Sequence, residues 1–228
     1  MQVNIILLAA GKGQRFAQSC SDRSACSTIK QLANLNNKPL ITHIIEQLSP
    51  ALTEPEVNKI FVTLGANKNA IQSVLPSYTS VIASTHWTGG MGYSLAESVF
   101  SIQAQSSHIL IALADHALIT SEHYHRLLAQ CRYNPNKIIA TSCDGQLMAP
   151  AIFPQQFFAK LTDLRGDKGA GELLKQYAVH VEAVANVLAK SDVDTVENLD
   201  QVQQILQNSL NQATSHCQTW SQYDQNNP

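Results

Sequence analysis

Short apolar runs alternate with amphipathic segments along most of the chain. The runs are rich in β-branched residues, and several of the segments between them place apolar residues at helical spacing. The predicted strands are Val3–Ala9, Lys59–Leu64, Ser80–Ala83, His108–Leu113, Lys137–Thr141 and Val179–Val184. Strands that alternate with helices indicate a mainly parallel sheet with helices on both faces. We therefore expect a Rossmann-like α/β domain with three layers, α/β/α.

Helix signals lie between these strands. One predicted helix starts at Pro39, and a second covers Lys68–Leu75 with Asn67 as its N-cap. A third covers Tyr93–Ile102. The fourth has Thr120 or Ser121 as its N-cap and runs through Leu128. A further extended stretch, Gly145–Phe153, contains Pro150, which cannot donate a hydrogen bond to a neighbouring strand. We expect this stretch to form an edge strand or an irregular one.

The end of the chain differs from the rest in composition. From about Asn211 it is rich in Gln, Asn and Ser and lacks apolar periodicity. We therefore divide the chain into one domain over residues 1–205 and a polar, weakly ordered tail over residues 206–228.

Composition and charge exclude some classes of partner. The formal net charge of −2 gives no attraction for nucleic acid or an anionic membrane surface. No apolar run reaches the roughly 18 residues that span a membrane. We expect neither nucleic acid nor a membrane as a partner.

The cysteines indicate a reducing compartment. They are odd in number and widely spaced, at Cys20, Cys26, Cys131, Cys143 and Cys217. Cys20 and Cys26 share a polar loop, but no histidine or second cysteine pair completes a metal-binding set. The chain also begins at a strand-like run with no basic segment before it. We expect reduced thiols and a cytoplasmic location.

Ligands of open α/β sheets bind beyond the carboxyl ends of strands. After the first predicted strand the chain reads Leu8, Ala9, Ala10, Gly11, Lys12, Gly13, Gln14, Arg15. Small residues let the backbone approach a ligand, and two cations beside it suit a polyphosphate. The spacing is neither a P-loop nor the GxGxxG fingerprint, whose third glycine is replaced by Phe16. The loop therefore predicts phosphate binding, with an ordinary glycine-rich turn as the alternative.

The run His108–Leu113 leads into Ala114, Asp115 and His116. An acidic residue at the end of a central strand is a suitable ligand for Mg²⁺. Asp115 is therefore the predicted metal ligand, with capping of the next helix as the alternative. His116 is expected to be an exposed loop histidine, with contact to a ligand as the alternative.

Taken together, these motifs resemble the MobA/MocA-like nucleotidyltransferases. The matching segments, in order, are Leu8–Arg15, Lys30 with Gln31 and Leu32, Lys38–Leu40, Gly90–Leu95, Ala112–Asp115, Leu164–Gly171 and Asp192–Leu199. The resemblance covers about residues 3–205, and the last two segments are similar to the molybdenum cofactor cytidylyltransferase branch. It implies a nucleotide-diphospho-sugar-transferase-like fold.

The resemblance also implies roles for individual residues. Arg15, Lys30 and Asp115 would be catalytic, with Lys30 neutralising the α-phosphate as pyrophosphate leaves. Nucleotide binding would involve Leu8, Ala9, Ala10, Gly11, Lys12, Gly13, Lys30, Gly92 and Ser94. Acceptor binding would involve Gly166, Asp167 and Gly169. Mg²⁺ would be held by Asp115 together with Asp194 or Asp192.

The chain departs from the family pattern at three places. Fourteen residues separate Arg15 from Lys30, where the family has only a few, so a polar flap or a mobile loop is expected there. Ala117 replaces a common proline. Gly171 replaces an arginine, which removes a cation that would contact an acidic acceptor.

The resemblance implies transfer of a nucleotide to a phosphorylated acceptor. Ala10 is similar to the cytidylyl branch, which points to CTP with molybdenum-bearing molybdopterin as acceptor, and to a molybdoenzyme or its maturation factor as a possible partner. Another small phosphate, a sugar phosphate among them, is the alternative acceptor. A non-catalytic cofactor-binding maturation protein is the alternative from another class. A hydride-transferring oxidoreductase is disfavoured, because Gly65, Ala66 and Asn67 stand where an acidic residue is expected.

Overall fold

The computed structural model describes residues 1–20 and 27–225. Its main strands are β1 (Val3–Ala9), β4 (Val57–Leu64), β5 (Thr79–Ala83), β6 (His108–Leu113), β7 (Ile138–Cys143), β8 (Gln146–Pro154) and β9 (Val181–Ala185). Two short strands, β2 (Asn34–Leu35) and β3 (Lys38–Pro39), form a separate antiparallel pair. The helices are α1 (Gln14–Ser19), α2 (Leu40–Leu48), α3 (Lys68–Gln72), α4 (Met91–Ile102), α5 (Ser121–Tyr133), α6 (Phe158–Thr162), α7 (Ala170–Gln176) and α8 (Val196–Gln225).

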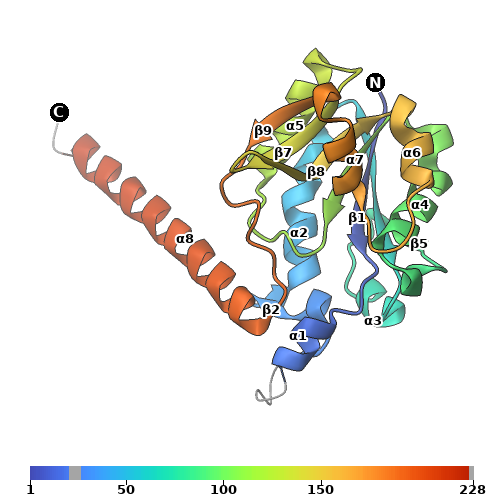
Figure 1. Cartoon of the computed structure of the whole chain (residues 1–228). Coiled ribbons are helices and arrows are strands. Elements are labelled where there is room, and N and C mark those ends of the chain that lie inside the picture. Colours follow the sequence, from blue (N-terminus) through green and yellow to red (C-terminus); the bar gives the residue numbers. More distant parts are fainter. Residues whose placement is uncertain (21–26, 226–228) are drawn as a thin grey trace.

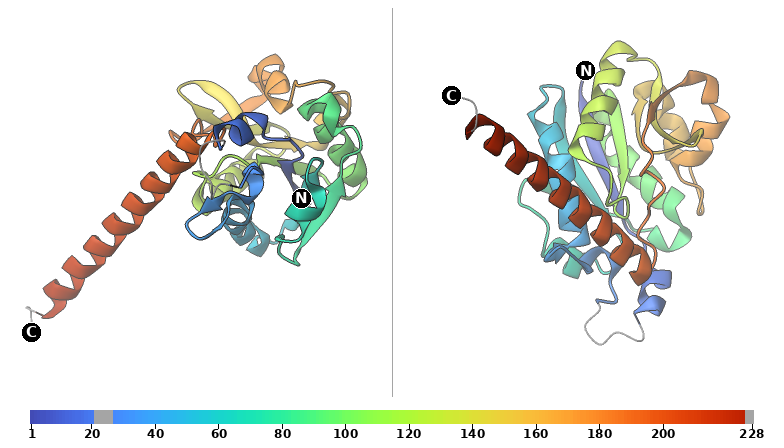
Figure 2. Two further views of the ribbon diagram at one scale, coloured as in Figure 1. Left: turned by 90° about the horizontal axis from the view of Figure 1, so that it is seen from below. Right: turned by 90° about the vertical axis from the view of Figure 1, so that its left-hand side faces the viewer.

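The main strands form one seven-stranded sheet in the order β5-β4-β1-β6-β8-β7-β9. Every pairing is parallel except those of β8, which is antiparallel to β6 and to β7. Helices lie on both sides of the sheet (Figures 1 and 2). The predicted three-layer α/β fold with a mainly parallel sheet is therefore confirmed.

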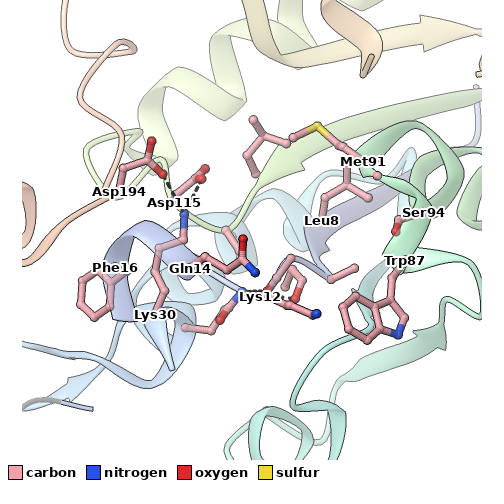
Figure 3. Close-up of a pocket in the computed structure, with 18 of the residues that line it drawn as sticks. Leu8, Lys12, Gln14, Phe16, Lys30, Trp87, Met91, Ser94, Asp115 and Asp194 are labelled. Carbon is pink, nitrogen blue, oxygen red and sulfur yellow. Dashed lines mark hydrogen bonds and ion pairs between the residues drawn. The ribbon is translucent and has the colours of Figure 1, made fainter. Parts of the chain in front are cut away.

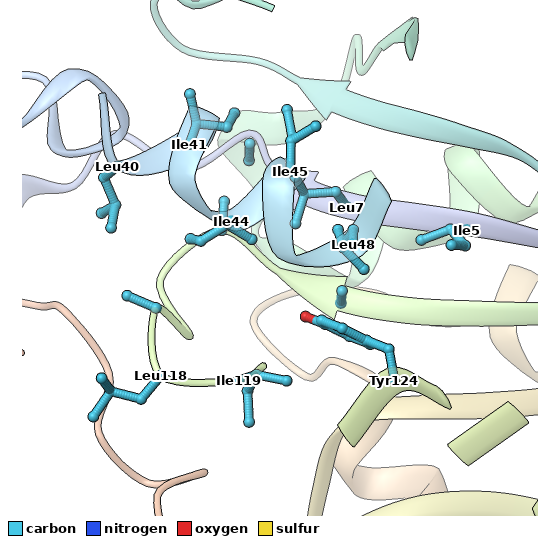
Figure 4. Close-up of a cluster of buried hydrophobic side chains, with 14 of the residues drawn as sticks. Ile5, Leu7, Leu40, Ile41, Ile44, Ile45, Leu48, Leu118, Ile119 and Tyr124 are labelled. Carbon is cyan, nitrogen blue, oxygen red and sulfur yellow. The ribbon is translucent and has the colours of Figure 1, made fainter. Parts of the chain in front are cut away.

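The two faces of the sheet bury separate hydrophobic clusters. On one face, Ile5 and Leu7 of β1 share a cluster with α2 and α5 (Figure 4). The start of α8 belongs to the same cluster. On the other face, Ile6 and Leu8 of β1 share a cluster with α4, α6 and α7. Because successive strand residues point to opposite faces, a central strand must be apolar at every position, and all seven residues of β1 are buried.

The predicted edge position of Gly145–Phe153 is wrong, because β8 lies inside the sheet between β6 and β7. The predicted irregularity is present. Ala140 pairs with Ala151 but Thr141 pairs with Met148, so the ladder skips Pro150. The Thr141 hydroxyl donates to the Pro150 carbonyl at 2.7 Å. This bulge lets an interior strand accommodate a residue that has no N–H.

The predicted helices lie where expected, but two of their caps differ. Asn67 and Thr120 occupy the N-cap positions of α3 and α5, and neither side chain makes a capping hydrogen bond. Asn67 instead has a left-handed backbone, with φ of 56°, a conformation that asparagine tolerates better than most residues. Its role here is therefore in the turn.

The chain after the last strand forms α8, which extends away from the sheet (Figures 1 and 2). The predicted boundary at residue 205 falls within this helix, and the division of the chain at that residue stays a prediction. Within the described residues, none of the helices is both long and apolar enough to cross a membrane.

Candidate active site

The glycine-rich loop joins β1 to α1 at the carboxyl edge of the sheet, as predicted. Gly13 has a left-handed backbone, with φ of 62°, and a Cβ there would lie 3.0 Å from Cβ of Lys30. Glycine at this position therefore allows both the turn into α1 and the close approach of Lys30. The turn places Arg15 in the first turn of α1, on the wall of a cavity.

Lys30 and two carboxylates form a charged cluster beside this loop (Figure 3). Lys30 Nζ lies 2.9 Å from Asp115 Oδ2 and 3.3 Å from Asp194 Oδ1. Arg15 Nη1 lies 2.9 Å from Asp194 Oδ2. The lysine is only 8% exposed, which makes the pairing important, because a buried ammonium without a partner is costly. The fourteen-residue separation of Arg15 and Lys30 thus does not prevent them from meeting at one carboxylate.

Asp192 is engaged elsewhere. Its Oδ1 lies 3.0 Å from His116 Nε2, whereas Asp194 lies in the Lys30 cluster. The Val193 N–H donates to the Asp115 carbonyl at 3.0 Å and so fixes this segment beside β6. Of the two aspartates predicted as alternatives, Asp194 is therefore the one whose carboxylate shares a cation with Asp115.

The expectation that His116 is exposed is wrong, because its side chain is 5% exposed. Burial lowers the pKa of this imidazole, but the hydrogen bond to Asp192 and the charge of Asp115 outweigh it, so the pKa lies above its ordinary value. The turn that follows β6 folds back under the 192–194 segment, a long-range contact that local sequence did not show.

The charged cluster opens into a cavity of about 550 Å³ (Figure 3). It is lined by Leu8, Ala9, Ala10, Gly11, Lys12, Gly13, Gln14, Arg15, Phe16, Lys30, Gln31, Trp87, Thr88, Gly90, Met91, Ser94, Leu113, Ala114, Asp115, Asp167 and Asp194. We call this the first cavity. It contains every predicted catalytic and nucleotide-binding residue except Gly92, which is buried behind its wall.

Gly92 belongs to a contact between two loops. Its N–H donates to the Gly166 carbonyl at 2.8 Å. Gly90 has φ of 111°, and a Cβ there would lie 2.4 Å from the Gly166 carbonyl carbon. These glycines therefore let the start of α4 lie directly against the loop that carries Asp167, one of the predicted acceptor residues.

A second cavity, of about 780 Å³, adjoins the first and shares Leu8, Met91 and Leu113 with it. Its other lining residues come from the start of β8, from α7 and from the segment after β9: Leu95, Ile111, His116, Gly145, Gln146, Leu147, Met148, Ala149, Gly169, Ala170, Gly171, Lys175, Ala178, Lys190 and Asp192. Sequence reasoning named Gly169 as an acceptor residue, Asp192 as an alternative metal ligand and Gly171 as a departure from the family, but it missed the two lysines.

Several cavity residues were missed or set aside. Gln31 is 3% exposed, and its amide donates to the Gly11 carbonyl at 3.2 Å, which ties it to the glycine-rich loop. The signal for it was its place directly after Lys30. Met91 lines both cavities, and its signal was its place in the Gly90–Leu95 segment.

Asp115 and Asp194 present carboxylate oxygens of the kind that bind a divalent cation. Among residues 1–20 and 27–225 no group of three or more His, Cys, Asp and Glu side chains is arranged to hold a metal. Mg²⁺ is commonly bound by one or two carboxylates, with substrate phosphates and water as its other ligands. Asp115 Oδ1 is buried without a hydrogen-bond partner, and Asp115 and Asp194 already share one cationic group. Two carboxylates here fit a metal ion that binds together with a phosphorylated substrate.

The expectation of reduced thiols fails at Cys20, which is disulfide-bonded. Sequence spacing does not show which sulfur atoms come within bonding distance. Cys131 and Cys143 are free thiols. Residues 21–26 of the insertion predicted to be a flap, Cys26 among them, lie outside the described residues, as does the side chain of Cys217.

A glycine-rich loop, a buried lysine and paired carboxylates at the carboxyl edge of such a sheet are suited to binding the phosphates of a nucleotide. The chain belongs to the family described as MobA-like NTP transferase domain, whose model matches residues 5–184. It is accordingly a nucleotidyltransferase of the MobA-like family.

Two curated proteins are similar to this chain over about two thirds of its length. The chain is 30% identical over 161 residues to the bifunctional protein GlmU of Legionella pneumophila strain Philadelphia 1, a match that covers 66% of this chain but 30% of that protein. It is 26% identical over 153 residues to a molybdenum cofactor guanylyltransferase of Shewanella sp. strain ANA-3, a match that covers 67% of this chain and 68% of that protein. The chain thus spans about a third of the GlmU relative.

Solved structures share the fold at lower identity. Rv0371c from Mycobacterium tuberculosis superposes with a TM-score of 0.71 at 20% identity, covering 90% of this chain and 98% of that one. The same protein has been solved with manganese, with a TM-score of 0.68 at 20% identity, covering 90% and 99%. A CMP:2-keto-3-deoxy-manno-octonic acid synthetase solved with CTP superposes with a TM-score of 0.62 at 13% identity. The match covers 92% of this chain and 100% of that one.

Proposed function

We propose that this protein transfers CMP from CTP to molybdenum-bearing molybdopterin and releases pyrophosphate. The observation that carries the proposal is the position of Lys30, paired with Asp115 and Asp194 beside the glycine-rich loop. A triphosphate in the first cavity meets two cations, Lys12 and Arg15, along that loop and the buried ammonium of Lys30 at its end.

The transfer needs no covalent intermediate on the protein. A phosphate oxygen of the acceptor attacks the α-phosphorus of CTP, and the bond from that phosphorus to the bridging oxygen breaks. The electron pair leaves with pyrophosphate, whose added charge must be neutralised. Lys30 and Arg15 supply positive charge at this point, and held donors of this kind are effective because they need no reorganisation.

Mg²⁺ would be held by Asp115 and Asp194. When bound, it supplies charge neutralisation to the triphosphate. Lys30 would then turn from the carboxylates toward the phosphates, because the metal ion would take its place between Asp115 and Asp194. The manganese bound in the Rv0371c structure supports a divalent cation in proteins of this fold.

The acceptor would enter through the second cavity. This cavity adjoins the first at Leu8, Met91 and Leu113, so a phosphate reaching across that wall approaches the nucleotide. Its floor is largely apolar, which suits a ring system, and Lys175 and Lys190 stand on its wall. Lys175 lies one helical turn beyond Gly171, so it returns a cation to the side that lacks the expected arginine.

The choice of CTP rests on Ala10, and the choice of molybdopterin on the branch that the late motifs resemble. The guanylyltransferase relative supports molybdenum cofactor as the acceptor. A sugar phosphate or another small phosphorylated molecule is the second candidate acceptor. A cytoplasmic location and contact with a molybdoenzyme or its maturation factor belong to the same proposal.

Thermal unfolding of the protein with Mg²⁺ and each of CTP, GTP, ATP and UTP tests the nucleotide. A ligand at about a hundred times its Kd stabilises the folded state by roughly 2.7 kcal/mol. The proposal expects the largest Mg²⁺-dependent shift with CTP. A larger shift with another nucleotide contradicts the choice of CTP, and no shift with any of them favours a non-catalytic maturation protein.

A further inference from the structure

Trp87 borders the first cavity at the end away from the charged cluster (Figure 3). It begins the short turn that links β5 to α4. Its side chain lies directly on Gly65, where a Cβ would be 2.4 Å from Trp87 Cγ. The absence of a side chain at Gly65 therefore allows the indole to pack against the backbone there.

The turn before Trp87 is held by one carboxylate. Glu97 of α4 accepts hydrogen bonds from the Ser84 hydroxyl at 2.5 Å and the Thr85 N–H at 2.9 Å. It also lies 2.5 Å from His86 Nδ1. Burial raises the pKa of Glu97, but these hydrogen bonds outweigh it and lower the pKa to about 2. The indole is thus presented by a turn that is already ordered.

The indole is partnered by Lys12. Lys12 Nζ lies over the Trp87 ring, 5.3 Å from its centre. Cation–π contacts of this kind are weak at exposed sites. Lys12 also belongs to the glycine-rich loop, so the same ammonium can reach either the ring or a phosphate in the first cavity.

The two ends of the first cavity therefore offer different chemistry. Lys30, Asp115 and Asp194 gather at one end, and Trp87 stands at the other, with Lys12 between them (Figure 3). A nucleotide whose phosphates lie against Lys30 extends its base toward Trp87. Aromatic faces bind bases of any kind by stacking.

We propose that Trp87 is the stacking platform for the nucleobase and that Lys12 leaves its ring to bind the triphosphate. This proposal rests on the proposed function, because it requires a nucleoside triphosphate in the first cavity. Stacking favours all bases, so Trp87 sets affinity, and discrimination among nucleotides belongs to other groups. Because the indole packs on Gly65 and its turn is held by Glu97, the ring needs little rearrangement to bind a base.

The test uses Trp220→Phe as background, which leaves Trp87 as the remaining one of the two tryptophans. Titration with CTP and with CMP, each with Mg²⁺, should change the Trp87 fluorescence saturably. In isothermal titration, Trp87→Ala should raise the Kd of both CTP and CMP by about tenfold. Trp87→Phe, which keeps a ring on Gly65, should recover most of the affinity.

Lys12→Gln separates the two parts of the proposal. It should weaken CTP about tenfold, as expected for loss of a hydrogen bond to a charged group, and leave CMP within about twofold. If the parent protein binds CTP but Trp87→Ala keeps the same Kd, the platform is refuted while the proposed function stands. If Lys12→Gln leaves the Kd of CTP unchanged, the exchange of Lys12 is refuted. If the parent protein binds none of the four nucleoside triphosphates, the proposed function is refuted and this inference with it.

Discussion

Lys30 Nζ lies 2.9 Å from Asp115 Oδ2, although the two residues are 85 positions apart in the chain. The contact joins the segment after the glycine-rich loop to the carboxyl end of a central strand. Asp194 completes it from the segment that precedes α8. Three distant parts of the sequence thus converge on one ammonium group, and the following expectations depend on that convergence.

Lys30→Gln should lower kcat for pyrophosphate release by about a hundredfold to a thousandfold, the range for removal of one held donor to a developing negative charge. Lys38→Gln is the matched control, because Lys38 is half-exposed and pairs with Glu46 on the surface. A steady-state assay of both variants checks this. Equal rates for the parent protein and Lys30→Gln would show that Lys30 does not act in the transfer.

Asp194→Asn and Asp192→Asn should differ in the Mg²⁺ concentration that they need for half-maximal activity. Asp194 shares Lys30 with Asp115, whereas Asp192 pairs with His116. Loss of a residue that only supports the metal ligands costs about tenfold to a hundredfold, so Asp194→Asn should raise the Mg²⁺ concentration for half-maximal activity by more than about a hundredfold. Asp192→Asn should stay below that. The reverse order in a Mg²⁺ titration would exchange the roles of the two residues.

Gly90→Ala and Gly171→Ala should differ in their effect on the thermal stability of the protein. A Cβ at Gly90 would collide with the Gly166 carbonyl group, and φ of 111° is itself unfavourable for alanine. We expect a loss of about 1–3 kcal/mol in the free energy of unfolding. At Gly171 a Cβ meets nothing within 4 Å, so alanine in this helix should be neutral or stabilising by up to about 1 kcal/mol. Equal melting temperatures would contradict the close contact of the two loops.

Glu97 should make stability depend on pH in acid. Its pKa is about 2 in the folded protein against 4.5 ordinarily. Because the folded-state pKa is depressed, its stabilising contribution is complete above pH 4.5 and is lost as pH falls from there toward 2. Urea unfolding of Glu97→Gln should therefore show a shallower loss of stability across that window. An unchanged slope would mean that the carboxylate is not held by the 84–86 turn.

Lys175→Gln should raise the KM of the acceptor and leave the Kd of CTP unchanged, because Lys175 lines the second cavity and not the first. An increase of about tenfold is expected for loss of one hydrogen bond to a charged group. Lys160→Gln, on an exposed position of α6, is the control. An effect on CTP binding with none on the acceptor would place the acceptor outside this cavity.

Much of the fold could be predicted because β1 and β6 are continuous apolar runs, and the structure gives both the predicted limits. Periodicity describes which faces of an element are buried, so it locates central strands well. It does not show which strands are neighbours. That is why Pro150 suggested an edge, whereas the bulge opposite Thr141 lets β8 lie inside the sheet.

The candidate site was predicted unevenly for a similar reason. The motifs located Lys30 and Asp115 as separate charges, but only tertiary structure brings them to one cluster with Asp194. His116 contacts Asp192, which lies 76 positions further along the chain, so its burial depends on a long-range contact. The place of Trp87 shortly after a strand fits stacking on a ligand and partial burial in the core equally well. Its contacts with Gly65 and Lys12, which belong to other loops, are visible only in the tertiary structure.

The most direct test of the account is pyrophosphate release from CTP with Mg²⁺ and molybdenum-bearing molybdopterin, measured for the parent protein and for Asp115→Asn. We predict acceptor-dependent turnover by the parent protein and a loss of about a hundredfold or more in the variant, with the fold retained in thermal unfolding. Equal turnover by the two proteins, or CTP binding without any pyrophosphate release, would contradict catalysis at the Lys30–Asp115 cluster.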